Sequence, residues 1–213
     1  TLWREEQDFP GWIYSSALMA VIVGILVLQP DIGMTLMLVL TWGFQMFLAG
    51  MPMLLVICIV ALAPLGLVVA YFNLGHVHKR INQFWEGGAW QVEKARDSFA
   101  NGGLFGVGPG DGTVKHHLPD AHSDFIFAVA GEEFGALACL TLLTLYAFIV
   151  LRGFSRAMSD EGLFCLIASA SLLLQFGVQA AIHMASSVHL IPTKGMTLPL
   201  ISYGGSSLVA SGL

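Results

Sequence analysis

A single carboxylate stands where a polar segment meets a long apolar one. Asp124 ends the polar stretch 115–124 and is followed by an apolar run that continues to Leu151. A carboxylate at such a junction can take a proton from a hydroxyl group, which is general-base catalysis. It can also accept hydrogen bonds from the first amides of a following helix, and the pattern alone favours this capping role for Ser123 or Asp124. Asp120 is a second candidate for the general base.

Two further carboxylates and one imidazole lie inside apolar segments. Glu132 and Glu133 fall two turns into the apolar run that follows Asp124. Ionisable residues in such runs are functional candidates by default. Each glutamate could pair with a cation of another helix or line a water-filled cavity, and the sequence favours neither alternative. Neither glutamate is predicted to be catalytic. His183 is predicted to form a hydrogen bond between helices rather than to bind a metal.

Few cationic side chains could meet a phosphate group. The candidates are Lys194, Lys115, Arg80 and His122, and a lysine would act there as a point charge. The alternative is a cation that contacts lipid headgroups while its stem lies on apolar surface. The glycine-rich run 102–110 does not follow a strand and open a helix, as a nucleotide-binding loop would. We interpret its glycines as turn formers that need a positive φ.

The composition places these residues in a membrane protein. Hydrophobic residues make up 56% of the 213 residues and charged residues only 11%, with a mean hydropathy of +0.76, whereas a soluble domain carries about a quarter charged residues. No Asp, Glu, Lys or Arg occurs in 32–78 or in 162–193. Uncharged apolar runs longer than about 18 residues predict membrane spans. The sequence offers no basic face for nucleic acid, and its three cysteines lie in apolar runs, where burial is expected.

The pattern predicts an all-α polytopic membrane protein with one large loop. We expect spans at 12–28, 32–49, 53–72, 124–151, 163–185 and 196–213, the last of them truncated. A helix of about 20 residues crosses the ~30 Å hydrocarbon core. Residues 73–123 form the loop and hold most of the charge. The chain starts without methionine and ends within an apolar segment, so we expect it to be an internal part of a longer protein.

The charge distribution gives one argument about orientation. Six crossings place Arg4, Arg152 and Arg156 on one side of the membrane. The other side receives six lysines and arginines, most of them in the large loop. The positive-inside rule would therefore put this loop in the cytoplasm.

Three motifs are long enough to indicate a family. They are Gln29-Pro30-Asp31-Ile32-Gly33, LPDAHSDFIFAVAGEEFG at 118–135 and PTKGMTLPLISYGGSS at 192–207. Together they resemble the SEDS family (shape, elongation, division, sporulation), most closely its division branch. The resemblance implies a roughly ten-helix SEDS fold in the bacterial cytoplasmic (inner) membrane, of which this chain supplies about six spans. It also implies that the large loop is extracytoplasmic. We adopt this orientation instead of the one that the positive-inside rule gives.

The resemblance implies a peptidoglycan glycosyltransferase that polymerises lipid II during cell division. In this reaction the 4-hydroxyl of an acceptor sugar attacks the anomeric carbon of the donor, and undecaprenyl pyrophosphate leaves. Asp124 matches the family's essential loop aspartate and is predicted to be catalytic. No metal ligand is predicted, although a divalent cation (Mg or Mn) could accompany the pyrophosphate. The candidates for substrate binding are Lys194, Lys115, His122 and Glu133.

The resemblance also implies partners, namely a class B penicillin-binding transpeptidase, divisome proteins and membrane lipid. The alternatives are an elongation-type SEDS polymerase, a lipid II flippase or transporter, and a non-catalytic scaffold. A flippase would need charge along a path across the bilayer, whereas charge here concentrates at one face. Two positions depart from the family pattern. Trp90 stands where tyrosine is usual, and His183 stands near the position where asparagine is usual.

Overall fold

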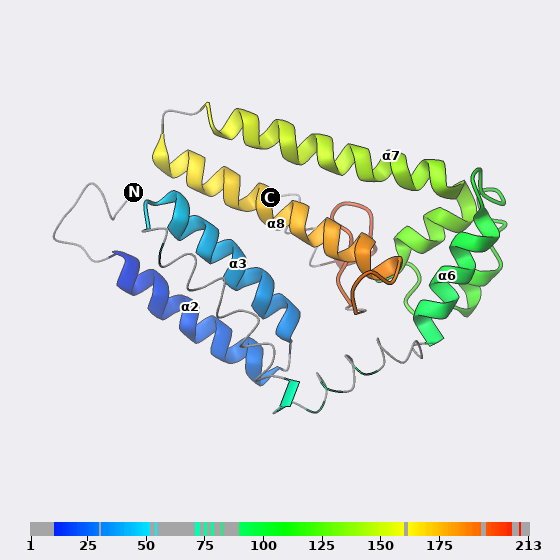
Figure 1. The fold of residues 1–213 in the computed structure, drawn as a ribbon, viewed down its shortest axis with the longest axis horizontal. Coiled ribbons are helices and arrows are strands. Elements are labelled where there is room, and N and C mark those ends of the chain that lie inside the picture. The colour runs from blue at the N-terminus through cyan, green and yellow to red at the C-terminus, as the bar shows by residue number, and fades with distance from the viewer. Residues whose placement is uncertain are drawn as a thin grey trace. The chain divides into compact units, whose positions relative to one another are not determined.

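The computed structural model describes residues 11–29, 31–51, 90–159, 162–192 and 195–205, together with a few isolated positions. Within these residues every regular element is helical, so the all-α prediction is confirmed (Figure 1). The elements are α2 (Gly11–Leu28), α3 (Ile32–Leu48), α6 (Trp90–Gly102), the short 3₁₀ helix η1 (Val114–His117), α7 (Ile126–Ala157) and α8 (Leu163–Ser187).

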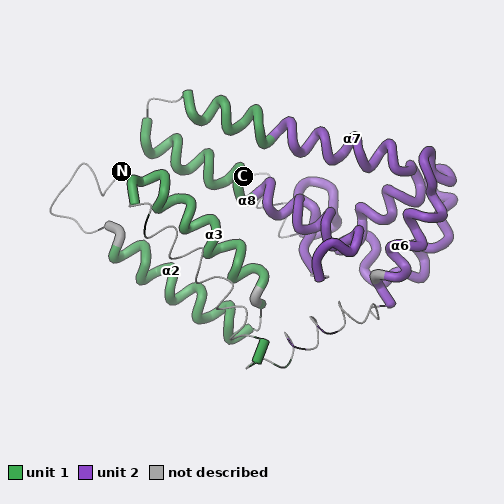
Figure 2. Tube along the Cα trace, in the orientation of Figure 1, with its two compact units in different colours: residues 1–76, 150–175 green, residues 77–149, 176–213 purple. Residues whose placement is uncertain are grey.

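The chain divides into two compact units (Figure 2). The first consists of residues 1–76 and 150–175, and the second of residues 77–149 and 176–213. Helices α7 and α8 each run from one unit into the other. The second unit contains Asp124 and the other described residues that were predicted to carry chemistry.

In the first unit, α2 and α3 pack against each other as a helical hairpin. Asp31 closes the turn between them, because its Oδ1 accepts a hydrogen bond from the Met34 amide at 3.1 Å. Such a cap satisfies an amide that has no partner inside the helix. Trp42 Nε1 donates to Ser15 Oγ at 3.1 Å and ties the two helices together. Large apolar side chains such as Leu18 are exposed, as expected for helices surrounded by lipid.

The helices follow the apolar runs closely. Helices α2 and α3 lie over the expected spans 12–28 and 32–49, and α8 lies over 163–185. With 32 and 25 residues, α7 and α8 are long and apolar enough to cross a membrane, whereas α2 and α3 are shorter apolar helices. The expected span 53–72 lies outside the described residues, apart from isolated positions.

The layout differs from the prediction at two places. Residues 196–204 were expected to open the last span, but they form turns, and the next helical position is Gly205. Pro199 lacks an amide hydrogen and disfavours a helical conformation at Leu198; Leu200 has a φ of 67°. The second difference is in the large loop, whose described part contains α6 and η1.

Gly135 interrupts the backbone of α7. Its φ of 81° and ψ of 179° belong to a region that is essentially restricted to glycine. A Cβ atom there would also collide with the Leu104 carbonyl and lie 2.5 Å from the Gly106 nitrogen. Residues on either side of the break bond to the glycine-rich segment 103–108 instead of to each other. The bonds are Ala136 N to Gly103 O (2.9 Å), Leu137 N to Leu104 O (3.3 Å), Val107 N to Glu132 O (3.0 Å) and Gly108 N to Glu133 O (3.1 Å).

Gly135→Ala is therefore expected to destabilise the protein. A non-glycine residue in this backbone conformation costs about 1–3 kcal/mol, and the added methyl group must also displace the segment 103–108. We expect a lower melting temperature in detergent and a lower abundance in membranes. Gly24→Ala in α2 is the control, because a Cβ there meets nothing within 4 Å. Equal melting temperatures for the two variants would contradict this account of the break.

Candidate active site

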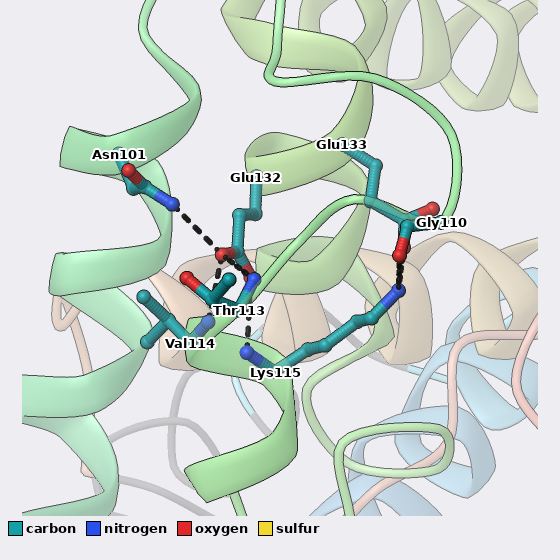
Figure 3. A network of polar contacts seen from close by, with 7 residues as sticks. All are labelled: Asn101, Gly110, Thr113, Val114, Lys115, Glu132 and Glu133. Atoms are coloured by element: carbon teal, nitrogen blue, oxygen red, sulfur yellow. Dashed lines mark hydrogen bonds and ion pairs between the residues drawn. The ribbon is translucent and has the colours of Figure 1, made fainter.

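Glu132 is fully buried, with 0% of its surface exposed, and its carboxylate accepts four hydrogen bonds (Figure 3). Oε1 accepts from the side-chain amide of Asn101 at 2.9 Å and from the backbone amides of Thr113 and Val114, both at 2.8 Å. Oε2 accepts from the backbone amide of Lys115 at 3.0 Å. One carboxylate thus joins α6, the start of η1 and α7. Among the described residues, the partners of Glu132 are amides and not a cation on another helix, which was one of its two predicted alternatives.

Lys115 and Glu133 form an ion pair next to this carboxylate (Figure 3). Lys115 Nζ also donates to the Gly110 carbonyl at 3.0 Å. Both side chains are mostly buried, with exposed fractions of 18% for Lys115 and 14% for Glu133. The structure therefore brings together two of the four residues predicted to bind substrate, and their charges balance.

Asp124 lies in the turn that leads into α7. Its amide donates to the Asp120 carbonyl at 2.9 Å, and Asp120 has a φ of 52°. The amides of Ala128 and Val129 in the first turn of α7 donate to the Phe125 carbonyl at 2.9 and 3.1 Å. Phe125 therefore takes the cap position. In the described part of the chain, the Asp124 carboxylate is not the helix cap that the sequence pattern favoured.

The Asp124 carboxyl group is half-buried, and its pKa is raised above the usual range. Burial is the main cause, and the negative charge of Asp120 adds to it. A hydrogen bond from Ser123 lowers the pKa, as do the charges of His183 and His122, but these effects are smaller in sum. A carboxylate with a raised pKa binds a proton more readily, which suits a general base.

The segment that follows α8 holds the turn around Asp124. Ser202 Oγ donates to the Ser123 carbonyl at 2.7 Å, and the Tyr203 amide donates to the His122 carbonyl at 3.0 Å. The rings of His122 and Tyr203 meet edge to face, with centroids 5.7 Å apart. His122, which was predicted to bind substrate, is therefore exposed beside Asp124 and packed against an aromatic ring.

Two side chains of α8 fix this segment in turn. His183 Nδ1 lies 2.6 Å from the Met196 carbonyl oxygen, and Gln179 Nε2 donates to the Thr197 carbonyl at 2.9 Å. The two side chains are four residues apart and therefore lie on one face of the helix. The sequence predicts that His183 bonds to another helix, whereas its partner in the structure is a backbone carbonyl.

The motifs that build this site belong to a known family. The sequence model of the cell cycle protein family of FtsW, RodA and SpoVE matches residues 4–212. The chain belongs to this family. The SEDS resemblance inferred from the three motifs is thereby confirmed.

Relatives within the family are named for the division branch. A probable peptidoglycan glycosyltransferase FtsW from Caulobacter vibrioides is 41% identical over 213 residues, which cover 99% of this chain and 55% of the relative. The protein of the same name from Legionella pneumophila is 35% identical over 210 residues, which cover 93% of this chain and 53% of the relative. The predicted similarity to the division branch is confirmed. The chain spans about half the length of these FtsW relatives.

Two solved structures of SEDS proteins resemble this chain. The first comes from a study of how a peptidoglycan synthase complex coordinates polymerization and crosslinking. Its TM-score is 0.74 at 28% identity, and the match covers 92% of this chain and 57% of that chain. The second is a point mutant of the rod shape determining protein RodA from Thermus thermophilus, with a TM-score of 0.59 at 27% identity, covering 93% of this chain and 53% of that chain. These matches identify the fold as that of a SEDS membrane protein.

Several residues that shape the site were missed by the sequence analysis. The hydroxyl of Tyr146 donates to the Pro199 carbonyl, and Gln179 bonds to the same segment. Ser202 of that segment donates to the Ser123 carbonyl. The available signal was a polar group inside an apolar run, which marks a side chain that needs a partner. Lys194, which was predicted to bind substrate, lies outside the described residues, as does Arg80.

Proposed function

We propose that the complete protein is a peptidoglycan glycosyltransferase that polymerises lipid II during cell division, with Asp124 as its general base. The half-buried Asp124 carboxylate carries this proposal, because it has a raised pKa and is held at the entry to a membrane helix. The FtsW relatives support the reaction class. The direct test is polymerisation of labelled lipid II by the purified complete protein, with and without a transpeptidase partner. Absence of glycan strands under both conditions would refute the proposal.

In the proposed reaction Asp124 takes the proton of the acceptor's 4-hydroxyl group. The oxygen forms a bond to the anomeric carbon of the donor sugar, and the bond from that carbon to the pyrophosphate oxygen breaks. Undecaprenyl pyrophosphate leaves with the electron pair, and the proton passes from Asp124 to water. The position of Asp124 between polar loop and apolar helix suits a substrate whose sugars are hydrated while its lipid stays in the membrane.

The substrate-binding residues follow from charge and position. We propose that His122 and Lys194 contact the sugar-pyrophosphate. His122 lies two residues before Asp124, and Lys194 directly precedes Gly195, whose backbone lies against the Asp124 carboxylate. The Lys115–Glu133 pair carries no net charge, so we propose that it binds hydroxyl groups of the substrate.

The leaving pyrophosphate needs positive charge. Lys194, or a divalent cation such as Mg or Mn that arrives with the substrate, would supply it. The described residues contain no group of three or more His, Cys, Asp or Glu side chains that could hold a metal ion. No step of the proposed reaction is therefore assigned to a metal site of the protein.

The rival functions make different demands on the same residues. An elongation-type polymerase shares the fold, and the division role rests on the 41% identity to an FtsW relative. A lipid II flippase would need carboxylates along a path across the bilayer. Glu132 and Glu133, the acidic side chains of α7, are instead bonded to the loop and to η1. For a non-catalytic scaffold Asp124 would be dispensable.

We propose that the protein works in the bacterial cytoplasmic membrane with a class B penicillin-binding transpeptidase and other divisome proteins. The resemblance to a peptidoglycan synthase complex that couples polymerization to crosslinking supports such a partner. In this arrangement the large loop faces outward, where lipid II presents its sugars.

The outward orientation of the loop can be tested with His116→Cys in a background without native cysteines. His116 lies exposed before α7, so we expect a membrane-impermeant thiol reagent to label it in intact spheroplasts. Ser159→Cys, exposed just after α7, is the control and should react only after the membrane is permeabilised. The reverse pattern would mean that the positive-inside count gives the true orientation.

A further inference from the structure

We propose that His183 is a positioning residue for Asp124, acting through the backbone that separates the two side chains. His183 fixes the Met196 carbonyl, and the neighbouring Gly195 lies against the Asp124 carboxylate. This role rests on the proposed function, because it assigns to His183 the task of holding the general base in place. It would make a histidine inside an apolar helix part of the support for the reaction.

The first step is the bond between His183 and Met196. The His183 side chain is 0% exposed, and its Nδ1 lies 2.6 Å from the Met196 carbonyl oxygen. A carbonyl oxygen can only accept, so Nδ1 carries a proton and donates it. A buried bond of this kind is costly to lose, because the carbonyl would be left without a partner. His183 therefore fixes the position of Met196 relative to α8.

The second step runs from Met196 to Asp124. A Cβ atom placed on Gly195 would lie 2.8 Å from Oδ2 of Asp124, so the backbone of Gly195 forms one wall of the carboxylate's environment. Gly195 and Met196 share a peptide bond, and a shift of one moves the other. Gln179 strengthens the arrangement one turn earlier on α8, where it holds the Thr197 carbonyl at 2.9 Å.

The second nitrogen of the ring offers a way to separate two roles. Among the described residues, Nε2 of His183 is buried and has no hydrogen-bond partner. A role of Nε2 in the reaction would be independent of the bond that Nδ1 makes to the Met196 carbonyl. Asparagine places an amide nitrogen at the same number of bonds from the backbone as Nδ1 but has nothing at the place of Nε2. His183→Asn therefore keeps the bond to Met196 and removes the other nitrogen.

The experiment measures lipid II polymerisation by the complete protein in liposomes, with its transpeptidase partner present. We expect His183→Ala to lower kcat by roughly 10–100-fold with little change in KM, because small misplacement of a catalytic group has effects of this size. His183→Asn should restore a rate close to that of the wild type. Ser187→Ala is the matched control, since Ser187 is equally buried on α8 but donates only to the His183 carbonyl within the helix, at 2.9 Å. It should leave kcat unchanged.

The outcomes separate this proposal from the proposed function. A wild-type protein that forms no glycan strands refutes the function, and the positioning role falls with it. If the wild type is active and His183→Ala is equally active, only the positioning role is refuted. Loss of activity in His183→Asn, at normal abundance, would also overturn it, because Nε2 would then be the nitrogen that matters. Should His183→Ala fail to accumulate, His183→Gln replaces it, since its amide lies one bond further out and misses the Met196 carbonyl.

Discussion

Asp124→Asn in the complete protein is expected to abolish detectable glycan polymerisation while membrane abundance and partner binding stay normal. Asparagine has nearly the same size, and the bond from the amide of residue 124 to the Asp120 carbonyl does not involve the side chain, so the turn should keep its shape. It cannot take up the acceptor's proton. General-base catalysis contributes about 10²–10⁴-fold to a rate, which places the product below ordinary gel detection. Polymerisation at a near wild-type rate would end the catalytic assignment of Asp124.

Asp120→Asn is the matched control for this variant. Asp120 has a φ of 52°, a conformation that asparagine also tolerates, so the turn should form. Its negative charge raises the pKa of Asp124, and removing that charge should lower this pKa. A general base must be deprotonated, so the rate rises as pH increases through its pKa. The acid limb of the pH–rate profile should therefore move to lower pH in Asp120→Asn, with activity retained at neutral pH.

Glu132→Gln is expected to destabilise the protein strongly. The amide group of glutamine keeps only one oxygen, and its nitrogen would face a backbone amide that now donates to the carboxylate. A buried donor left without an acceptor costs about 1–3 kcal/mol, and hydrogen bonds to a charged group are worth about 1.5–3 kcal/mol each. Since four donors converge on Glu132, we expect a markedly lower melting temperature in detergent and loss of activity through loss of folded protein.

The neighbouring Glu133→Gln provides the comparison for Glu132→Gln. Among the described residues its side-chain partner is Lys115, and a glutamine oxygen can still accept from that ammonium group. Because this hydrogen bond is kept and no donor is left facing a donor, the melting temperature should fall less than in Glu132→Gln. Melting temperatures that fall equally in the two variants would show that the four bonds to Glu132 do not stabilise the loop as inferred here.

The sequence predicted the helices well because hydropathy decides them. Helices α2, α3, α7 and α8 all lie over uncharged or nearly uncharged apolar runs, and lipid selects for such runs whatever the detailed packing. The position of Asp124 at the junction of polar loop and apolar helix could also be predicted, because it follows from the order of residues alone. Its catalytic role stays a prediction from the resemblance, to which the structure adds the burial and the neighbours that raise its pKa.

Other features depend on contacts that no local pattern contains. The break at Gly135 was not predicted, because hydropathy carries no information about backbone dihedral angles. The residues that flank Gly135 are as apolar as those of a continuous membrane helix. The partners of Glu132 lie 17 to 31 positions earlier in the chain, so the choice between a cation, a cavity and backbone amides depended on how the loop returns. The turn at 196–204 was hidden for a similar reason. Its residues Met196, Leu198 and Pro199 are buried against protein in a non-helical form, and hydropathy does not distinguish them from residues of a membrane helix.

The residues that bond to Glu132 are synthesised before it, because the ribosome makes the chain from its N-terminus. Asn101 and the amides of residues 113–115 all precede Glu132 in the chain, so they have left the ribosome before it does. An acidic side chain entering the centre of a membrane without partners costs about 2.5–3.5 kcal/mol during cellular insertion. Here the groups that solvate the carboxylate are already made when it arrives. For this carboxylate, the entry of α7 into the bilayer therefore does not depend on α8 or on any helix synthesised later.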